Sequence, residues 1–224
     1  MKHRWVWLGA AAAVAAAWFG GPPLLRKAEF FRVRRVEFVG LRYQAADSAL
    51  KALKLPRRLS VFDDLDAIRA RARRIPGIRS AEVGRRLPGT LVVRVEERAP
   101  VALVTTHQGL RLMDASGALL PFDPVRSAPD LPVADTATAA IGQLLSAIRR
   151  VQPGLFRRIA VAGMAGRDVA VTADGHRYLF RRDASNQEMR AVMLVAADLT
   201  RKGRTFGELD GRFTGYVVVR GAGA

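Results

Sequence analysis

Residues Arg79–Ala102 read RSAEVGRRLPGTLVVRVEERAPVA, and this stretch decides how the first half of the chain folds. Apolar and charged residues alternate in two runs, 78–85 and 90–97, and a four-residue link that contains Pro and Gly joins them. Such a link between alternating runs rich in β-branched residues predicts a β-hairpin. Successive strand residues face opposite sides of a sheet, so the second run has a dry face that another element must cover. That face consists of Leu91, Val93 and Val95.

The residues before the hairpin supply this cover. A strand is predicted over 31–40, and apolar residues then recur at helical spacing over 44–53 and from Asp63 to the Pro76-Gly77 pair. The resulting order is strand, helix, helix, strand, strand. We therefore expect an α+β fold in which two amphipathic helices cover one face of a three-stranded sheet, within a domain over 30–98.

Three carboxylates, Asp63, Asp64 and Asp66, stand at the start of the second helix. An oxygen-ligand cation loop needs further ligands at alternate positions and a turn glycine, and the stretch has neither. Capping of the helix N-terminus is the favoured interpretation.

A second domain is predicted over 99–220, as a mixed β-sheet with packed helices, followed by a tail over 221–224. Its helices are expected over 136–151 and from Ser185, where Glu188 completes a capping box, to Gly203. A proline-rich passage over 121–132 is expected to be an extended linker. The predicted strands cover 101–105, 110–114, 118–122, 155–161, 169–172, 176–180 and 213–220.

The N-terminal stretch 5–25 is uncharged and follows a basic tail over 1–4. As a helix it would be about 31 Å long, close to the hydrocarbon thickness of a bilayer of about 30 Å. A transmembrane helix, with the bulk of the chain outside the cytoplasm, is favoured. The alternative is a cleaved signal peptide, because Ala15-Ala16-Ala17 satisfies the small-residue rule for cleavage.

Charge and cysteine content restrict the function classes. The chain has no cysteine, which excludes disulfides and thiolate metal sites. Its formal net charge of +17 invites a nucleic-acid interpretation, but 32 of its 37 cations are arginines dispersed along the sequence. We expect no nucleic-acid partner, and attraction to anionic lipid head groups is at least as natural.

Candidate catalytic groups are few. His107 and His176 both fall in predicted hairpin turns, without a partner motif. Glu96 and Glu97 are adjacent in a strand and therefore point to opposite faces. No nucleophile elbow or phosphate loop is present. We predict no catalytic residue, metal, cofactor or small-molecule substrate, and hence a protein that is not an enzyme and works through its surface.

Several motifs of the first domain resemble those of a polypeptide-transport-associated (POTRA) domain. They are the Leu59-x-x-Phe62-x-x-Leu65 spacing and the IPGIRSAEV run over 75–83. The RRLPGTL run over 85–91 and the ERAPVA run over 97–102 are similar to the version in the bacterial cell division family FtsQ, also called DivIB. The resemblance covers about residues 1–220 and is strongest between 30 and 122.

This resemblance implies a single-pass inner-membrane protein at the division septum, with a POTRA domain and a β domain. It also implies docking of small division proteins of the FtsB and FtsL type at the end of the β domain. Asp210-Gly211-Arg212-Phe213 resembles the Asp-Leu-Arg-aromatic element of the family, and Gly211 departs from it. The residues expected to bind a partner are Arg212, Phe213, Thr214, Gly215, Tyr216, Val217, Val218 and Val219.

The predicted last strand fits two interpretations. As an edge strand it could accept a strand of another chain by β-augmentation. As an inner strand, Val217 to Val219 would simply be core. A competing function is that of a POTRA-containing factor for export or assembly of envelope proteins, and a further alternative is an anchored nucleic-acid binder.

Overall fold

A computed structural model describes residues 29–127 and 130–221. The predicted tail over 1–4 and the transmembrane helix over 5–25 lie outside these residues. Within the described ranges, no helix is long and apolar enough to cross a membrane. The chain forms two compact units, Met1–Glu97 and Arg98–Ala224.

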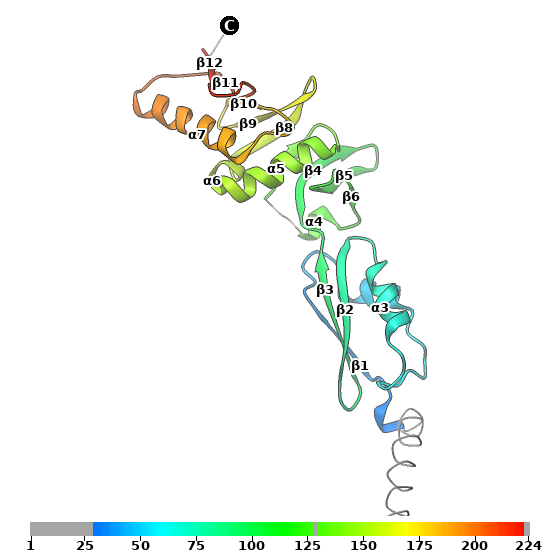
Figure 1. The fold of residues 1–224 in the computed structure, drawn as a ribbon. Coiled ribbons are helices and arrows are strands. Elements are labelled where there is room, and N and C mark those ends of the chain that lie inside the picture. The colour runs from blue at the N-terminus through cyan, green and yellow to red at the C-terminus, as the bar shows by residue number, and fades with distance from the viewer. Residues whose placement is uncertain (1–28, 128–129, 222–224) are drawn as a thin grey trace, which may run out of the picture. The chain divides into compact units, whose positions relative to one another are not determined.

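The first unit contains a three-stranded sheet and two helices (Figure 1). Strand β3 is central, with β1 parallel to it on one side and β2 antiparallel on the other. The predicted hairpin and the order of strands and helices are thus confirmed. The elements are η1 (Glu29–Phe31), β1 (Arg35–Val39), α2 (Ala46–Leu53), α3 (Asp66–Arg73), β2 (Ile78–Arg86) and β3 (Thr90–Glu97).

The predicted dry face of the hairpin is the core of this unit. Leu91, Val93 and Val95 of β3 are buried in one apolar cluster together with residues of α2 and α3. Leu53 ends α2, and Ile68 lies on the inward face of α3. Removal of these side chains from water is the main stabilising term of the unit.

The second unit is built on a nine-stranded sheet, in the order β12-β11-β10-β9-β8-β7-β4-β5-β6. Helices α5 and α7 pack against it and bury residues such as Leu145, Ile148, Met189 and Val192 in a second apolar cluster (Figure 1). The strands are β4 (Pro100–Thr106), β5 (Gly109–Asp114), β6 (Leu119–Leu120), β7 (Val133–Ala134), β8 (Ile159–Ala165), β9 (Asp168–Ala173), β10 (His176–Phe180), β11 (Glu208–Asp210) and β12 (Val218–Arg220). The helices are α4 (Pro124–Ser127), α5 (Ala139–Val151), α6 (Pro153–Phe156) and α7 (Asn186–Arg201).

Two predictions for the middle of this unit are wrong in detail. The passage 121–132 is not extended throughout, because Pro124 begins the short helix α4 and the Asp123 carboxylate accepts the N–H of Val125. The strand expected from Leu155 begins at Ile159, because Pro153 starts the helical turn α6 and suits its first position.

The predicted strand over 213–220 is also wrong in its first part. Residues 213–217 form a turn and an irregular segment, and only Val218–Arg220 pair as β12. Gly215 has a φ of +87°, which interrupts extended backbone. This correction changes how the candidate site has to be understood.

Candidate partner-docking edge

Strand β12 lies at one end of the nine-stranded sheet. Its described neighbour is β11, with which it pairs antiparallel over the register Glu208↔Arg220, Leu209↔Val219 and Asp210↔Val218. The outer side of such a strand presents backbone N–H and C=O groups that can pair with another chain. The sequence left an edge strand and an inner strand equally open, and the structure places β12 at the edge.

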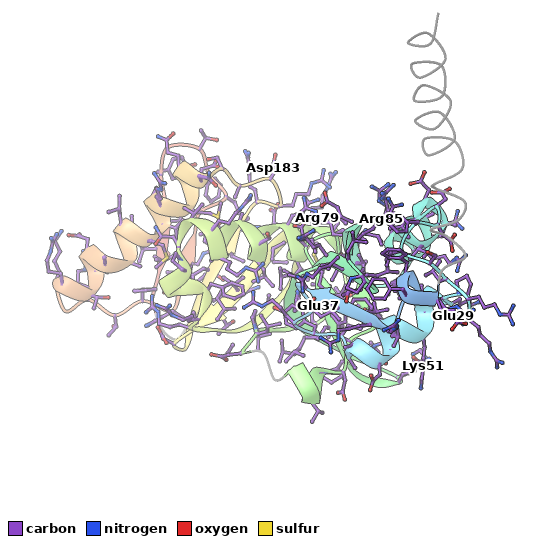
Figure 2. The ribbon with its side chains drawn as sticks, turned by 90° about the horizontal axis from the view of Figure 1, so that it is seen from below. Glu29, Glu37, Lys51, Arg79, Arg85 and Asp183 are labelled. Atoms are coloured by element: carbon purple, nitrogen blue, oxygen red, sulfur yellow. The ribbon has the colours of Figure 1, made fainter. Side chains whose placement is uncertain are left out.

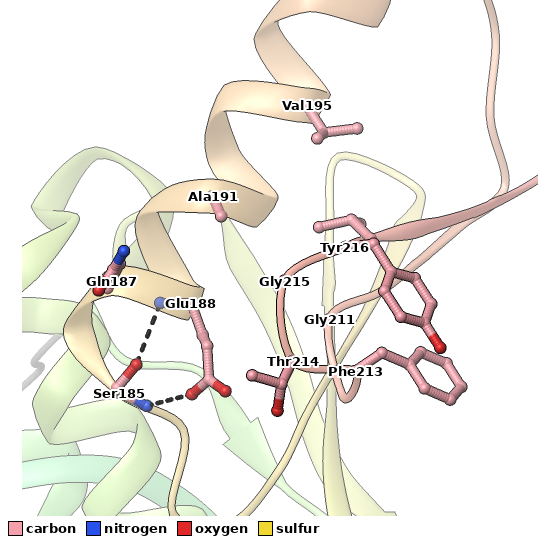
Figure 3. A pocket seen from close by; sticks show the side chains of 11 residues that line it. Ser185, Gln187, Glu188, Ala191, Val195, Gly211, Phe213, Thr214, Gly215 and Tyr216 are labelled. Carbon is pink, nitrogen blue, oxygen red and sulfur yellow. Dashed lines mark hydrogen bonds between the residues drawn. The ribbon is translucent and has the colours of Figure 1, made fainter.

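The turn before β12 displays two aromatic rings. Phe213 and Tyr216 stack with centroids 5.1 Å apart and planes inclined by 10°. Both rings reach solvent, with 38% of Phe213 and 60% of Tyr216 exposed. Figure 3 shows the two rings side by side, on the side of the turn that faces away from α7. Exposed stacked aromatics of this kind are common anchors of protein interfaces.

A groove of about 450 Å³ separates this turn from α7. Val195, Ala191 and Gln187 line it from the helix, and Phe213 and Tyr216 are among the residues that line it from the turn (Figure 3). Reasoning from the sequence placed no α7 residue at the site. The helical spacing of Gln187, Ala191 and Val195, offset from the buried Met189 and Val192, is the signal that could have found this face.

The first turn of α7 fixes one charge at this groove. Ser185 Oγ accepts the Glu188 N–H at 3.2 Å, and Glu188 Oε2 accepts the Ser185 N–H at 2.7 Å, which confirms the predicted capping box. The backbone hydrogen bond from Ser185 holds the pKa of Glu188 below its usual value. The groove therefore carries a fixed negative charge near neutral pH.

A buried ion pair anchors the start of the turn. The carboxylate of Asp210 is fully buried and accepts hydrogen bonds from Arg212 Nε at 2.8 Å and Nη2 at 2.7 Å. This hydrogen bonding lowers the pKa of Asp210 and raises the pKa of Arg212. Arg212 also lies 3.6 Å from Asp168, and Arg220 lies 3.5 Å from Asp210. The guanidinium of Arg212, a residue expected to bind a partner, thus forms ion pairs within the second unit.

A second set of charges links the last three strands. Glu208 on β11 pairs with Arg177 on β10 at 2.9 Å and with Arg220 on β12. Only 13% of its side chain is exposed. These contacts run across the strands and hold β12 in register beside β11.

Close packing explains why position 211 holds a glycine. A Cβ at this position would lie 2.3 Å from Val192 Cγ2 and 3.3 Å from the carbonyl oxygen of Leu179. The Gly211 N–H donates to that same carbonyl at 2.9 Å. The departure from the Asp-Leu-Arg-aromatic element therefore accompanies close packing between the chain and α7.

The other candidates lie apart from this edge. His107 is exposed in the β4–β5 turn, as expected, whereas His176 begins β10, stacks on Phe206 and has Nδ1 2.7 Å from the Phe206 carbonyl oxygen.

Glu96 contacts Arg79 and Ser80, while Glu97 accepts backbone N–H groups, so the two carboxylates do serve opposite sides. The predicted capping of the second helix is wrong, because α3 begins only at Asp66, Leu65 is at its N-cap and no side chain caps it. Asp64 Oδ1 accepts the Asp66 N–H as a local bond. Among residues 29–127 and 130–221, no group of three or more His, Cys, Asp or Glu side chains is placed to hold a metal ion.

Comparison with known proteins agrees with this architecture. The family profile described as "POTRA domain, FtsQ-type" matches residues 31–98. A protein of Rhodothermus marinus named "Cell division protein FtsQ" is 32% identical over 225 aligned positions, which cover 86% of this chain and 78% of that protein. The chain belongs to the FtsQ family. The resemblance inferred from the hairpin motifs is thereby confirmed, and the first unit is called the POTRA unit below.

Other FtsQ relatives match over shorter regions. The "Cell division protein FtsQ" of Zymomonas mobilis is 36% identical over 129 residues, which are 55% of this chain and 41% of the relative. That of a Jannaschia species is 35% identical over 88 residues, which are 39% of this chain and 28% of the relative. In these alignments the chain spans less than half the length of each FtsQ relative.

Proposed function

We propose that this FtsQ-family chain is a non-enzymatic, single-pass membrane scaffold of the bacterial division machinery. In this proposal residues 5–25 anchor it in the inner membrane, and its second unit docks division proteins of the FtsB and FtsL type at the septum. The docked segment adds to β12 as a further strand, and the scaffold thereby coordinates the synthesis of septal wall. Family membership and the names of the relatives support a role in cell division.

The observation that carries the docking proposal is the position of β12. Edge strands supply backbone groups that give affinity, and neighbouring side-chain pockets give specificity. Here the exposed backbone edge lies directly after the Phe213–Tyr216 stack and its groove. The occupant we propose is therefore an extended segment on β12, with an adjoining apolar side chain at the groove.

The site residues take different roles in this proposal. Val218 and Val219 supply the backbone edge, and Phe213, Thr214, Tyr216 and Val217 supply the wall of the groove. Gly215 permits the turn between them, and Arg212 positions that turn through Asp210. We expect substitution of Arg212 to weaken docking indirectly, through loss of the turn.

The decisive experiment replaces one valine of β12. Val219 is 44% exposed on this edge, and Val161 is 47% exposed on β8, which pairs with strands on both sides. We expect Val219→Lys to weaken binding of purified FtsB-type and FtsL-type periplasmic segments at least about tenfold in calorimetry, since charge on an edge opposes strand addition. Val161→Lys is the matched control and should bind as the unsubstituted protein does.

A second variant distinguishes loss of docking from loss of folding. Truncation after Val217 removes β12 but leaves the apolar cluster of the second unit in place. We expect it to melt cooperatively and to bind neither segment. Wild-type affinity in both the truncated and the Val219→Lys proteins would contradict docking at this edge.

Depletion in cells tests the role as a whole. Loss of a division scaffold is expected to produce filaments with unconstricted septa. Cells of normal length with misassembled outer-membrane proteins would contradict the division role and favour the export or assembly function instead.

A further inference from the structure

The end of the POTRA unit that contains the β2–β3 hairpin tip is built from three segments. The N–H groups of Arg34 and Arg35 donate to the Gly89 carbonyl at 2.8 and 3.2 Å. The N–H of Val33 donates to Leu59 at 2.9 Å, and Arg32 forms an isolated bridge with Ser60. The residues from Glu29 to Arg35, the turn 56–60 and the hairpin tip 86–89 therefore form one contiguous surface, called the basic end here (Figure 1).

Arginine dominates the charge of the basic end. Arg34, Arg35, Arg57 and Arg58 are exposed and form no ion pair with a described carboxylate. Two further arginines are paired on the surface, Arg32 with Glu29 at 2.9 Å and Arg86 with Glu37 at 2.7 Å.

Two further charged residues beside this surface, Arg85 and Asp63, bond to backbone groups, and the exposed Asp64 lies next to Asp63. Arg85 Nη2 donates to the carbonyl of Asp63, and the Asp63 carboxylate accepts the Ser60 N–H. Figure 2 shows Glu29, Glu37 and Arg85 on this unit. The unpaired arginines therefore leave the basic end with excess positive charge.

Two large apolar side chains project from the same surface. Phe30 and Leu87 are each 59% exposed, and they come from different segments of the basic end. An exposed aromatic and an exposed aliphatic side chain among cations are the composition that partitions into the interface of an anionic bilayer. A surface that binds nucleic acid by stacking would instead interleave several aromatics along a basic groove.

We infer that the basic end of the POTRA unit docks peripherally on an anionic phospholipid bilayer. The arginines contact phosphate groups of the lipid heads, and Phe30 and Leu87 enter the head-group layer. The order of residues along the chain supports a membrane as the occupant. The basic end begins at Glu29, just after the cations Arg26 and Lys27 and the uncharged stretch 5–25, which the proposed function places in the membrane. This contact is separate from the edge at β12 and does not depend on partner docking.

The first test measures binding to vesicles of defined composition. A fragment over 29–224 contains both apolar clusters and lacks the uncharged stretch, so binding cannot arise from that stretch. We expect it to sediment with vesicles of phosphatidylethanolamine and phosphatidylglycerol, not with phosphatidylcholine vesicles. Binding should weaken as ionic strength rises, because salt screens exposed charges.

Two triple variants locate the contact. Arg35, Arg57 and Arg58 belong to the basic end, whereas Arg42, Arg74 and Arg79 lie near Ile78 and Glu97, where the hairpin has its open end. Replacing the first three by Gln should lower the partition coefficient about a hundredfold, since one surface arginine contributes about fivefold on an anionic membrane. The second triple variant should retain most of the binding.

Single tryptophans report the depth of insertion. The three tryptophans of the chain precede residue 19, so the fragment has none. Phe30→Trp should show a blue shift of its fluorescence with the anionic vesicles. Val39→Trp, at the other end of β1, is the matched control and should show no shift.

Equal losses of vesicle binding in the two triple variants would overturn the inference. The absence of a fluorescence shift in the Phe30→Trp protein would overturn it as well. Equal binding to phosphatidylcholine vesicles would do so too, since the charge would then play no part. Tighter binding to a DNA duplex than to anionic vesicles at the same salt would replace a membrane with a nucleic acid as the partner. Variants of β12 should leave vesicle binding unchanged, which separates a failure here from a failure of partner docking.

Discussion

The carboxylate of Asp210 and the guanidinium of Arg212, two residues apart, form a bidentate ion pair with hydrogen bonds of 2.8 and 2.7 Å. The carboxylate is fully buried, and Arg212 retains some contact with solvent. Two parallel N–H···O bonds fix both distance and orientation. The pair therefore sets the path of the chain from β11 into the aromatic turn.

We predict that Asp210→Asn destabilises the second unit by about 2 kcal/mol at pH 7, because a charged hydrogen-bond acceptor is lost from a buried position. Hydrogen bonds from Arg212 lower the pKa of Asp210 in the folded chain. The stabilisation is therefore complete above the unfolded pKa of about 3.9 and disappears as the pH falls through the lower folded pKa. Thermal or urea unfolding from pH 7 to pH 2 should show the two proteins converging in stability below about pH 4.

The control for this pair is Asp183→Asn. Asp183 is an exposed residue whose partner is Arg181, and such surface pairs contribute about 0.5 kcal/mol or less. A constant difference between Asp210→Asn and the unsubstituted protein across the whole pH range would contradict the role given to the ionised carboxylate.

The POTRA unit offers a test with two adjacent residues. Glu97 accepts the backbone N–H groups of Arg42, Tyr43 and Gln44 at 2.7, 2.8 and 2.9 Å. Glu97→Ala removes all three bonds and should destabilise this unit by about 2 kcal/mol, the scale of a lost charged hydrogen-bond acceptor. Hydrogen exchange should reveal faster exchange at these amides.

Glu96→Ala is the matched control, because Glu96 makes only exposed contacts with Arg79 and Ser80. We expect a change of about 0.5 kcal/mol or less. Equal destabilisation by the two substitutions would mean that the carboxylate of Glu97 does not hold this loop.

A third prediction concerns the close approach of Gly211 to α7. Gly211→Leu forces a Cβ to within 2.3 Å of Val192 Cγ2, so we expect destabilisation of about 1–3 kcal/mol from overpacking. Val192→Ala should relieve part of this cost. The double variant is then more stable than the sum of the single effects predicts, by about 1 kcal/mol.

Gly154→Ala serves as the comparison for Gly211, because no atom lies within 4 Å of a Cβ built at Gly154 in α6. It should be neutral or slightly stabilising in a denaturant titration. Strict additivity of Gly211→Leu and Val192→Ala would refute the proposed contact.

The capping box at the groove gives a fourth prediction. Ser185→Ala removes the acceptor for the Glu188 N–H and should cost about 1 kcal/mol. Gln187 is exposed in the same first turn of α7, two residues after Ser185. Gln187→Ala should therefore have little effect on the melting temperature. If the two variants melt together, the box does not stabilise α7.

Elements with strong local patterns were predictable from the sequence. Alternation over the β2–β3 hairpin and the Ser185–Glu188 box each have a short-range physical cause, and both are confirmed. Strand β11, Glu208–Asp210, was missed because a segment this short carries no usable period. It forms only because β10 and β12 flank it.

The same reason limited prediction of the candidate site. The valines before Arg220 favour a long strand, yet the pairing surface on β11 is only three residues long, so residues 213–217 are left to turn. The helical spacing of Gln187, Ala191 and Val195 marks a face of α7, but its position opposite the turn depends on tertiary packing at Gly211. Sequence reasoning thus named the turn residues that line the groove, but no residue of α7.

The place of β12 at the end of the sheet has a consequence for any assembly made there. A strand added to β12 does not end the sheet, because the added strand becomes the new edge strand with its own unpaired backbone groups. Addition of further chains is then prevented only by features on the outer side of the added strand. The stoichiometry of such a complex is therefore decided by the incoming segment and not by this chain.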